Sequence, residues 1–169
     1  ENLDRWRSEL DACYDGRPNH PITHRLAETI PHFPIPKQYF HELIDGVEMD
    51  LTTRRYETFD ALYDYCFKVA SVIGLICIEI FGYSNPKTKE YAIALGIALQ
   101  LTNILRDLKA DAAQGRIYIP KEDLLKFGYT EDDLIYTRRN DAFRNLMAFE
   151  CSRAREFYQR SGSLLPPRG

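Results

Sequence analysis

Residues 96–111 read GIALQLTNILRDLKAD, an apolar stretch with polar residues at regular intervals. Asn103, Asp107 and Asp111 follow one another at intervals of four, so a helix places them on one face, one turn apart. Gln100 lies one turn earlier on the same side. Four oxygen-bearing side chains therefore follow one face of an otherwise apolar helix, and that face is the first candidate for a functional site.

Chemistry at this face follows from the repulsion between its carboxylates. Like charges on neighbouring turns repel each other, and their burial is costly unless something compensates the charge. A bound cation is one such compensation, and a ligand set made only of oxygens favours Mg²⁺ over zinc or iron. The alternative is a solvated helix end in which Asn103 is a satisfied polar group of the core.

The helical pattern continues outward on both sides of this stretch. Residues 69–81 and 91–105 are almost free of charge, and a helix that is apolar on every side is buried on every side, which predicts a bundle with a central pair. We expect helices at about 3–14, 22–30, 36–51, 61–81, 85–111, a short one between Pro120 and Gly128, and a last long one that Thr130 and Asp133 open as a capping box. No segment alternates strictly, so the expected class is all-α without a sheet.

Composition bounds the function. A chain of 169 residues with 44% apolar residues is one domain with a core, and a net charge of -3 argues against nucleic acid as a partner. Cys13, Cys66, Cys77 and Cys151 form no CxxC pair or zinc spacing, which indicates reduced thiols and a cytosolic location. We find no secretory signal and no apolar stretch of the roughly 20 residues that a membrane span needs.

Two further groups of residues have open interpretations. Tyr65, Val69 and Ile73 form a stripe that is either a ligand wall or plain core, and Gly74 allows close approach of a neighbour or a ligand. Arg106 and Arg116 could reach a phosphate held at a metal, or Arg106 could pair with an acid on its own helix. A second acidic set consists of Asp45, Glu48 and Asp50, which do not share one face of a helix. Arg54 and Arg55 are nearby, which favours ion pairs at the surface.

Three motifs resemble those of squalene and phytoene synthases. QLTNILRD at 100–107, with Asp111 and GRIYIP at 115–120, resembles the second aspartate-rich motif of that family. YCFKVASVIG at 65–74 resembles its other signature helix, and LIDGVEMDL at 43–51 also fits. The resemblance runs from about Leu3 to Pro167. It implies an isoprenoid (prenyl) synthase-like helical bundle with a central cavity, and a prenyltransferase that joins two prenyl diphosphates head to head.

The resemblance also implies roles for residues. Asn103, Asp107 and Asp111 would bind Mg²⁺, for which Mn²⁺ can substitute, and the ion would bridge to diphosphate and draw charge from the leaving group. Catalysis would rest on Asp107, Asp111 and Tyr65. Substrate binding would fall to Tyr65, Val69, Ile73, Gly74, Gln100, Asn103, Arg106, Arg116 and Tyr118.

The expected substrate follows from finer similarity. VAS at 69–71 and IEIFGY at 78–83 look most like the bacterial presqualene diphosphate synthase of hopanoid biosynthesis, which joins two farnesyl diphosphates without NADPH. Phytoene synthase, which uses geranylgeranyl diphosphate, is the close alternative. A non-catalytic relative that serves as an assembly or binding partner and a bundle with a structural divalent ion are two others. Peripheral contact with a membrane is compatible with such greasy substrates, although no amphipathic anchor is evident.

The chain departs from the family pattern in two ways. The first aspartate-rich motif and the C-terminal helices are absent from residues 1–169, so we expect a partial domain, truncated at both ends, that is inactive alone. Lys109 stands where the family commonly has Gly, and Ala110 where it commonly has Glu. The less negative local charge predicts weakened or altered diphosphate binding.

Overall fold

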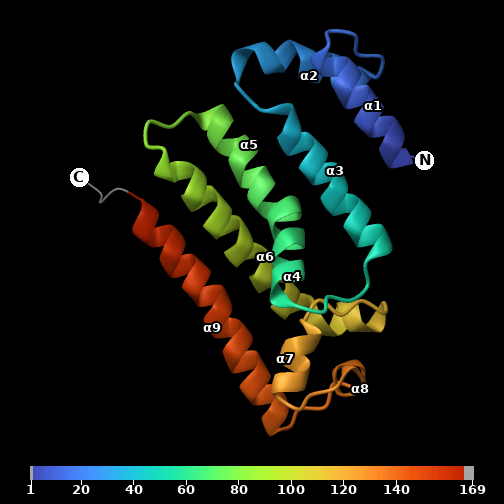
Figure 1. Ribbon diagram of the computed structural model, residues 1–169, viewed down its shortest axis with the longest axis vertical. Helices are drawn as coiled ribbons and strands as arrows, with labels where there is room; N and C mark the ends of the chain where they lie inside the picture. The colour runs from blue at the N-terminus through green and yellow to red at the C-terminus, as the bar shows by residue number, and fades with distance from the viewer. Residues whose placement is uncertain (1, 166–169) are drawn as a thin grey trace.

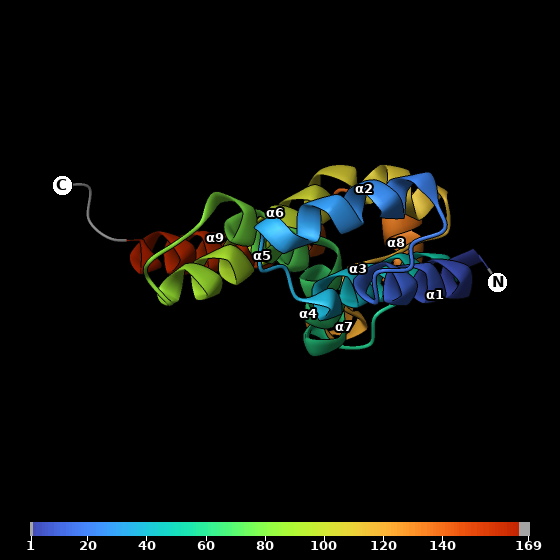
Figure 2. The same ribbon diagram turned by 90° about the horizontal axis from the view of Figure 1, so that it is seen from above.

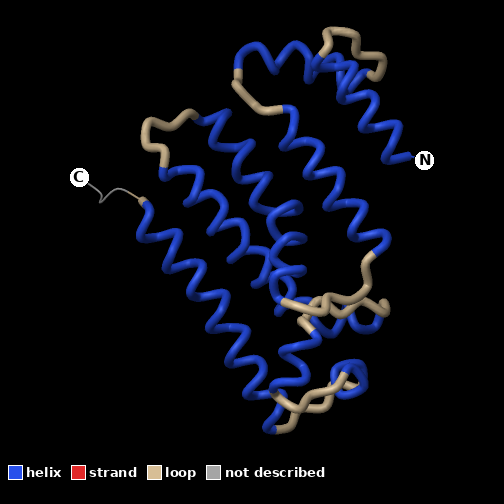
Figure 3. Tube along the Cα trace, viewed as in Figure 1, coloured by secondary structure: helices blue, strands red, loops and turns tan. Residues whose placement is uncertain are grey.

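The computed structural model describes residues 2–165 and is built from helices joined by short loops (Figures 1 and 3). The elements are α1 (Asn2–Tyr14), α2 (Pro21–Thr29), a 3₁₀ turn (Ile30–His32), α3 (Lys37–Thr52), α4 (Phe59–Cys66), a π-helical segment (Phe67–Ser71), α5 (Val72–Phe81), α6 (Lys87–Ala113), α7 (Lys121–Lys126), α8 (Glu131–Ile135) and α9 (Asp141–Leu164). Within residues 2–165 the only β-type pairing is an isolated parallel bridge between Arg55 and Ile117. The all-α prediction is confirmed.

Helix α6 is the central element. It packs along α9 on one side and along α5 and the π-helical segment on the other, while α3 packs against α5 and α1 against α3 (Figure 1). Seen from above, α9 and α1 lie at opposite sides of this row of helices (Figure 2). The fully buried side chains come from helices and from the segment after α6, and they include Leu62, Cys66, Val72, Ile97, Ile117, Ile119 and Leu146.

The two central helices, α5 and α6, are less completely buried than the sequence predicts. Helix α6 is covered by α5 and α9, but Ile73 on α5 is 47% exposed, Phe81 is 82% exposed and Leu99 on α6 is 49% exposed. Helices α3 and α6 cover two sides of α5, and no helix among residues 2–165 covers the third. An apolar run therefore predicts burial on every side only where every side has a neighbour.

The helix predicted over 61–81 is divided. Thr58 caps it, because its hydroxyl oxygen accepts from the backbone N–H of Ala61 at 3.3 Å. After α4 the helix widens into the π-helical segment and then continues as α5. It ends at Gly82, whose φ is +78°. π-Helical turns inside α-helices often occur at functional sites. At the end of this segment, the Ser71 hydroxyl donates to the carbonyl of Ile93 on α6 at 2.8 Å.

The prediction of one last long helix from Thr130 is wrong. Thr130 and Asp133 do form a capping box, but the helix that they open is the short α8. Thr137, with φ of +54°, turns the chain away, and Asn140 caps α9 by accepting from the backbone N–H of Phe143 at 2.9 Å. The capping signal was correct, and the break lies at a left-handed threonine that the sequence does not mark.

One helical segment has the length and composition of a membrane span. Phe59–Phe81 is long and apolar enough to cross a membrane, which corrects the expectation that no stretch reaches that length. A single such helix is weak support for a span, because core helices can share this length and composition. In this structure the segment packs against α3 and α6.

A buried ionic cluster joins α7, α9 and α4. Arg153 donates to both carboxylate oxygens of Asp123, at 2.8 and 3.2 Å, and to Glu150 at 2.8 Å. Its guanidinium lies between the rings of Phe59 and Phe149, 4.1 and 4.6 Å from their centroids. One carboxylate oxygen of Glu150 is buried without a hydrogen-bond partner, and burial raises the pKa of Glu150 to about 7.

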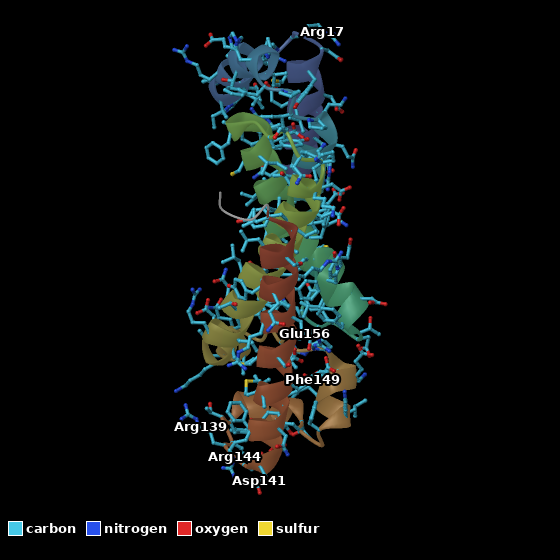
Figure 4. All side chains as sticks on the ribbon, turned by 90° about the vertical axis from the view of Figure 1, so that its left-hand side faces the viewer. Arg17, Arg139, Asp141, Arg144, Phe149 and Glu156 are labelled. Atoms are coloured by element: carbon cyan, nitrogen blue, oxygen red, sulfur yellow. The ribbon has the colours of Figure 1, made fainter. Side chains whose placement is uncertain are left out.

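We expect Glu150→Gln to stabilise the protein at pH 8. The folded state binds the Glu150 proton more tightly than the unfolded state does, so the contribution of Glu150 to stability is fully present below about pH 4.5 and is lost as pH rises through about 7. The amide removes this buried charge and still accepts from Arg153, so we expect a gain of about 1–3 kcal/mol at pH 8 and none at pH 4. Urea unfolding at both pH values measures it. Exposed Glu156 on the same helix (Figure 4) is the control, since Glu156→Gln should leave both values unchanged.

Candidate functional site

The acidic face of α6 forms one wall of the candidate site. Asn103, Asp107 and Asp111 are all half-buried and lie one turn apart in the C-terminal half of the helix. The amide of Asn103 donates to the side-chain oxygen of Gln100 at 3.5 Å, so these two predicted neighbours do meet. Arg106 donates to both oxygens of Asp107, at 2.6 and 2.9 Å. Of the two interpretations of Arg106, the structure shows the pair on its own helix.

The two carboxylates of this face differ electrostatically. The guanidinium of Arg106 holds the pKa of Asp107 below its usual value. Burial raises the pKa of Asp111, and the charges of Asp107 and Asp50 raise it further, while Arg116 opposes them. Asp111 therefore lies among negative charges that come from two different helices, which is an environment that a divalent cation would stabilise.

Asp50, at the end of α3, is the residue that sequence reasoning missed. Its Oδ1 accepts hydrogen bonds from the Tyr65 hydroxyl at 2.9 Å and from the Tyr118 hydroxyl at 3.0 Å. Its backbone carbonyl accepts from Arg116 at 3.0 Å. Two phenols, from α4 and from the segment after α6, thus converge on the Asp50 carboxylate, and Arg116 binds the backbone carbonyl of the same residue.

The second acidic set does not pair with Arg54 and Arg55, so this prediction is wrong. Asp45 and Glu48 pair with Arg7 of α1, at 2.7 and 2.8 Å. Arg55 pairs instead with Glu131, at 2.8 Å. Helices α1 and α8 supply these partners from distant positions in the sequence, so nearness along the chain was a poor guide.

Three tyrosine rings line the buried side of Asp50. The rings of Tyr56, Tyr65 and Tyr118 lie with centroids 5.4–5.9 Å apart. Burial raises the pKa of all three phenols, so they stay protonated and can donate. The Tyr56 hydroxyl is buried and has no hydrogen-bond partner among the described residues. This cluster presents a polar edge to the site and an aromatic body to the core.

The segment after α6 is held by the bridge to Arg55. The backbone N–H of Ile117 donates to the carbonyl of Arg54 at 3.1 Å, which keeps the segment extended. Side chains of an extended chain alternate between two sides, so Arg116 and Tyr118 face the site while Ile117 is fully buried in the core. The Nε of Arg116 is buried without a partner, which leaves a donor for an anion.

The apolar residues predicted to line a cavity are not all brought together. Ile73 and Gly74 line an open groove of about 400 Å³ between α5 and α6, together with small and apolar side chains as far as Phe81 and Tyr91. The groove is not lined by Tyr65, Val69 or Gln100. Tyr65 turns inward and donates to Asp50 instead. A Cβ at Gly74 would lie 3.2 Å from the carbonyl oxygen of Ala92, so this glycine permits the approach of a neighbouring helix.

A divalent cation fits the donors on α6. Asp107 and Asp111 offer two carboxylates and Asn103 an amide oxygen, and Mg²⁺ is often held by one or two carboxylates with water and phosphate oxygens completing the shell. Residues 2–165 contain no cluster of three or more His, Cys, Asp or Glu side chains arranged to hold a metal. The assignment of Asn103, Asp107 and Asp111 as ligands stays a prediction.

Known proteins resemble this chain over nearly its whole length. The family model for squalene/phytoene synthase matches residues 1–167. The phytoene synthase of Arthrospira platensis is 43% identical over 94% of this chain and 55% of its own, and the chloroplastic phytoene synthase 1 of Arabidopsis thaliana is 40% identical over 92% and 38%. The chain thus spans about half the length, or less, of these relatives.

Solved structures show the same fold. The squalene synthase HpnC from Alicyclobacillus acidocaldarius superimposes with a TM-score of 0.91 at 33% identity, over 98% of this chain and 64% of that one. A dehydrosqualene synthase in complex with a ligand gives 0.86 at 30% identity, over 96% and 58%. The arrangement of helices found here is therefore that of an isoprenoid synthase.

Proposed function

The chain belongs to the squalene/phytoene synthase family, and from this premise we propose that the protein joins two prenyl diphosphates head to head. The observation that carries the proposal is the convergence of Asp50, Tyr65, Tyr118 and Arg116 beside the acidic face of α6. Anionic, cationic and phenolic groups so placed suit a reaction that expels diphosphate and forms a carbocation.

The diphosphate would bind at the carboxyl-terminal half of α6. Mg²⁺ held by Asn103, Asp107 and Asp111 would neutralise charge on the leaving diphosphate. Arg116 is fixed by its bond to the Asp50 carbonyl, and its unpartnered Nε can donate to a phosphate oxygen. Arg106 can do the same from the flank of α6 when it leaves Asp107.

Tyr65 and Asp50 would stabilise the positive charge that remains. The Tyr65 hydroxyl donates to the Asp50 side chain, which increases the electron density of the phenol oxygen. Such an oriented dipole stabilises a carbocation without reorganising during the reaction. Tyr65 is 3% exposed and Tyr118 is 9% exposed, so water is kept away from the phenol oxygens that would stabilise the carbocation.

The groove between α5 and α6 would hold a prenyl chain. Its lining is apolar, and it runs beside α6. The acidic face of that helix, with Asn103, Asp107 and Asp111, is called the metal face below. The phytoene synthases share 40–43% identity with this chain and the squalene synthase structure shares 33%. This difference favours geranylgeranyl diphosphate over the farnesyl diphosphate that the finer sequence motifs predict.

A product assay on the full-length protein tests the proposal. We would supply Mg²⁺ with geranylgeranyl diphosphate and, separately, with farnesyl diphosphate, both without NADPH. We expect phytoene from the first, and presqualene diphosphate from the second would instead support the hopanoid assignment. A folded protein that forms neither product would contradict the proposal and favour the non-catalytic relative.

We expect Asp50→Asn to lower product formation by about ten- to a hundredfold. The amide cannot accept two phenolic protons with the strength of a carboxylate, so Tyr65 and Tyr118 lose their fixed orientation. Steady-state kinetics measures the change, and Asp45→Asn is the matched control on the same helix. Equal activity of both variants would show that the Asp50 cluster is structural.

A further inference from the structure

A second groove system lies on the opposite side of α6 from the metal face. Lys109 follows Asp107 by two residues, which is about 200° around a helix axis. Lys109 lines a groove of about 170 Å³ between α6, α8 and α9, whose floor includes Leu105, Phe143 and Met147. We call this groove and its continuation the back trough.

The back trough continues along the α6–α9 seam. A neighbouring groove of about 360 Å³ shares Leu105 and Arg106 with the first, and Ala154 and Tyr158 of α9 line it further along. Arg106 therefore stands where the two parts meet. The combined trough therefore has a smaller part beside α8 and a larger part along the α6–α9 seam.

Charge in the back trough has one sign. Arg106, Lys109 and Arg139 line its first part and Arg155 its second, while no Asp or Glu side chain lines either. In the described part of the chain, Lys109 and Arg139 form no ion pair, and the proposed reaction uses neither of them. Figure 4 looks onto α9 and shows Arg139 beside the start of this helix, toward the C-terminal end of α6.

We propose that the back trough binds a single-chain amphiphile with a phosphate head group. Lys109 and Arg139, which have no acidic partner within residues 2–165, would receive the phosphate together with the neighbouring Arg106, because clustered cations provide charge-assisted donors. The chain would lie on Leu105 and Ala154 along the seam. A free phosphate ion would leave that apolar floor uncovered, so the head group alone should bind much more weakly.

Arg106 couples the back trough to the metal face. Its guanidinium lines the trough and at the same time donates to both oxygens of Asp107. A phosphate in the trough competes for this guanidinium and so releases the Asp107 carboxylate toward a cation. By linkage, the amphiphile must then raise the affinity for Mg²⁺ by the same factor as Mg²⁺ raises the affinity for the amphiphile.

The test is calorimetric binding of dodecyl phosphate, below its micelle concentration, to the full chain in EDTA. Without metal the acidic face of α6 repels phosphate, so this arm is independent of the proposed reaction. We expect the double variant Lys109→Ala/Arg139→Ala to bind at least about tenfold more weakly. Arg160→Ala, which removes an exposed cation of α9 outside the trough, should bind as the parent does.

Three outcomes would overturn the proposed site. They are no binding of dodecyl phosphate, equal binding by the double variant, and inorganic phosphate binding as tightly as dodecyl phosphate. The coupling has its own test, a Mg²⁺ titration with and without dodecyl phosphate. We expect dodecyl phosphate to raise the Mg²⁺ affinity several-fold, and Arg106→Gln to abolish this gain. The same titration of the Lys109→Ala/Arg139→Ala variant measures how much Mg²⁺ the amphiphile itself captures. No gain in the parent protein would overturn the coupling.

Discussion

Asp107→Asn in the full-length protein should lower product formation by about a thousandfold. The variant keeps the size of the side chain and removes the carboxylate charge that the proposed Mg²⁺ site requires. Because the charge that Asp107 would help a bound Mg²⁺ to neutralise would be greatest on the leaving diphosphate, the loss should fall on kcat more than on KM. Steady-state product analysis at saturating Mg²⁺ measures it.

The control for Asp107→Asn is Glu90→Gln in the first turn of α6. Glu90 is exposed and distant from the acidic face, so its variant should retain full activity. Loss of the Arg106 ion pair alone cannot mimic the expected effect, because the Arg106 side chain is 66% exposed and that of Asp107 is 43% exposed, and such pairs contribute little to stability. An Asp107→Asn protein with a third or more of parental activity would remove Asp107 from the catalytic assignment.

Gly96→Ala should destabilise the fold by about 3 kcal/mol. A Cβ at Gly96 would lie 2.5 Å from the Cα and 2.6 Å from the backbone nitrogen of Ser71, at the end of the π-helical segment. Backbone atoms cannot rotate away as a side chain can, so α6 and the π-helical segment must separate. Urea unfolding measures the loss, and activity should fall with it because α6 carries the acidic face that we propose binds Mg²⁺.

Gly162→Ala is the matched control in α9. A Cβ there meets nothing within 4 Å, and alanine favours a helix over glycine, so we expect no loss and a gain of up to about 1 kcal/mol. If Gly96→Ala were as stable as Gly162→Ala, the close contact between α6 and the π-helical segment would not exist in solution.

Local sequence signals predicted α6 and its acidic face well. The helix expected over 85–111 occurs as Lys87–Ala113, and intervals of four place Asn103, Asp107 and Asp111 on one side of it. Periodicity suffices here because the relevant neighbours lie on the same helix. The family assignment came from the same stretch, together with YCFKVASVIG, and the comparisons confirm it.

Contacts between distant segments could not be predicted. Asp50 joins the site only because α3 ends beside α4 and because the bridge between Arg55 and Ile117 brings Tyr118 to it, 68 residues away along the chain. No local pattern encodes such a meeting. The exposed apolar side of α5 was missed for a related reason, since hydrophobicity does not tell which neighbours are present.

The binding of a non-reactive prenyl thiodiphosphate to the full-length protein at increasing Mg²⁺ concentrations tests whether the acidic face of α6 holds a cation. If the α6 carboxylates hold a cation that receives the diphosphate, affinity should rise at least tenfold between EDTA and saturating Mg²⁺, and Asp107→Asn should abolish most of the rise. Equal affinity with and without Mg²⁺ in the parent protein would contradict the account.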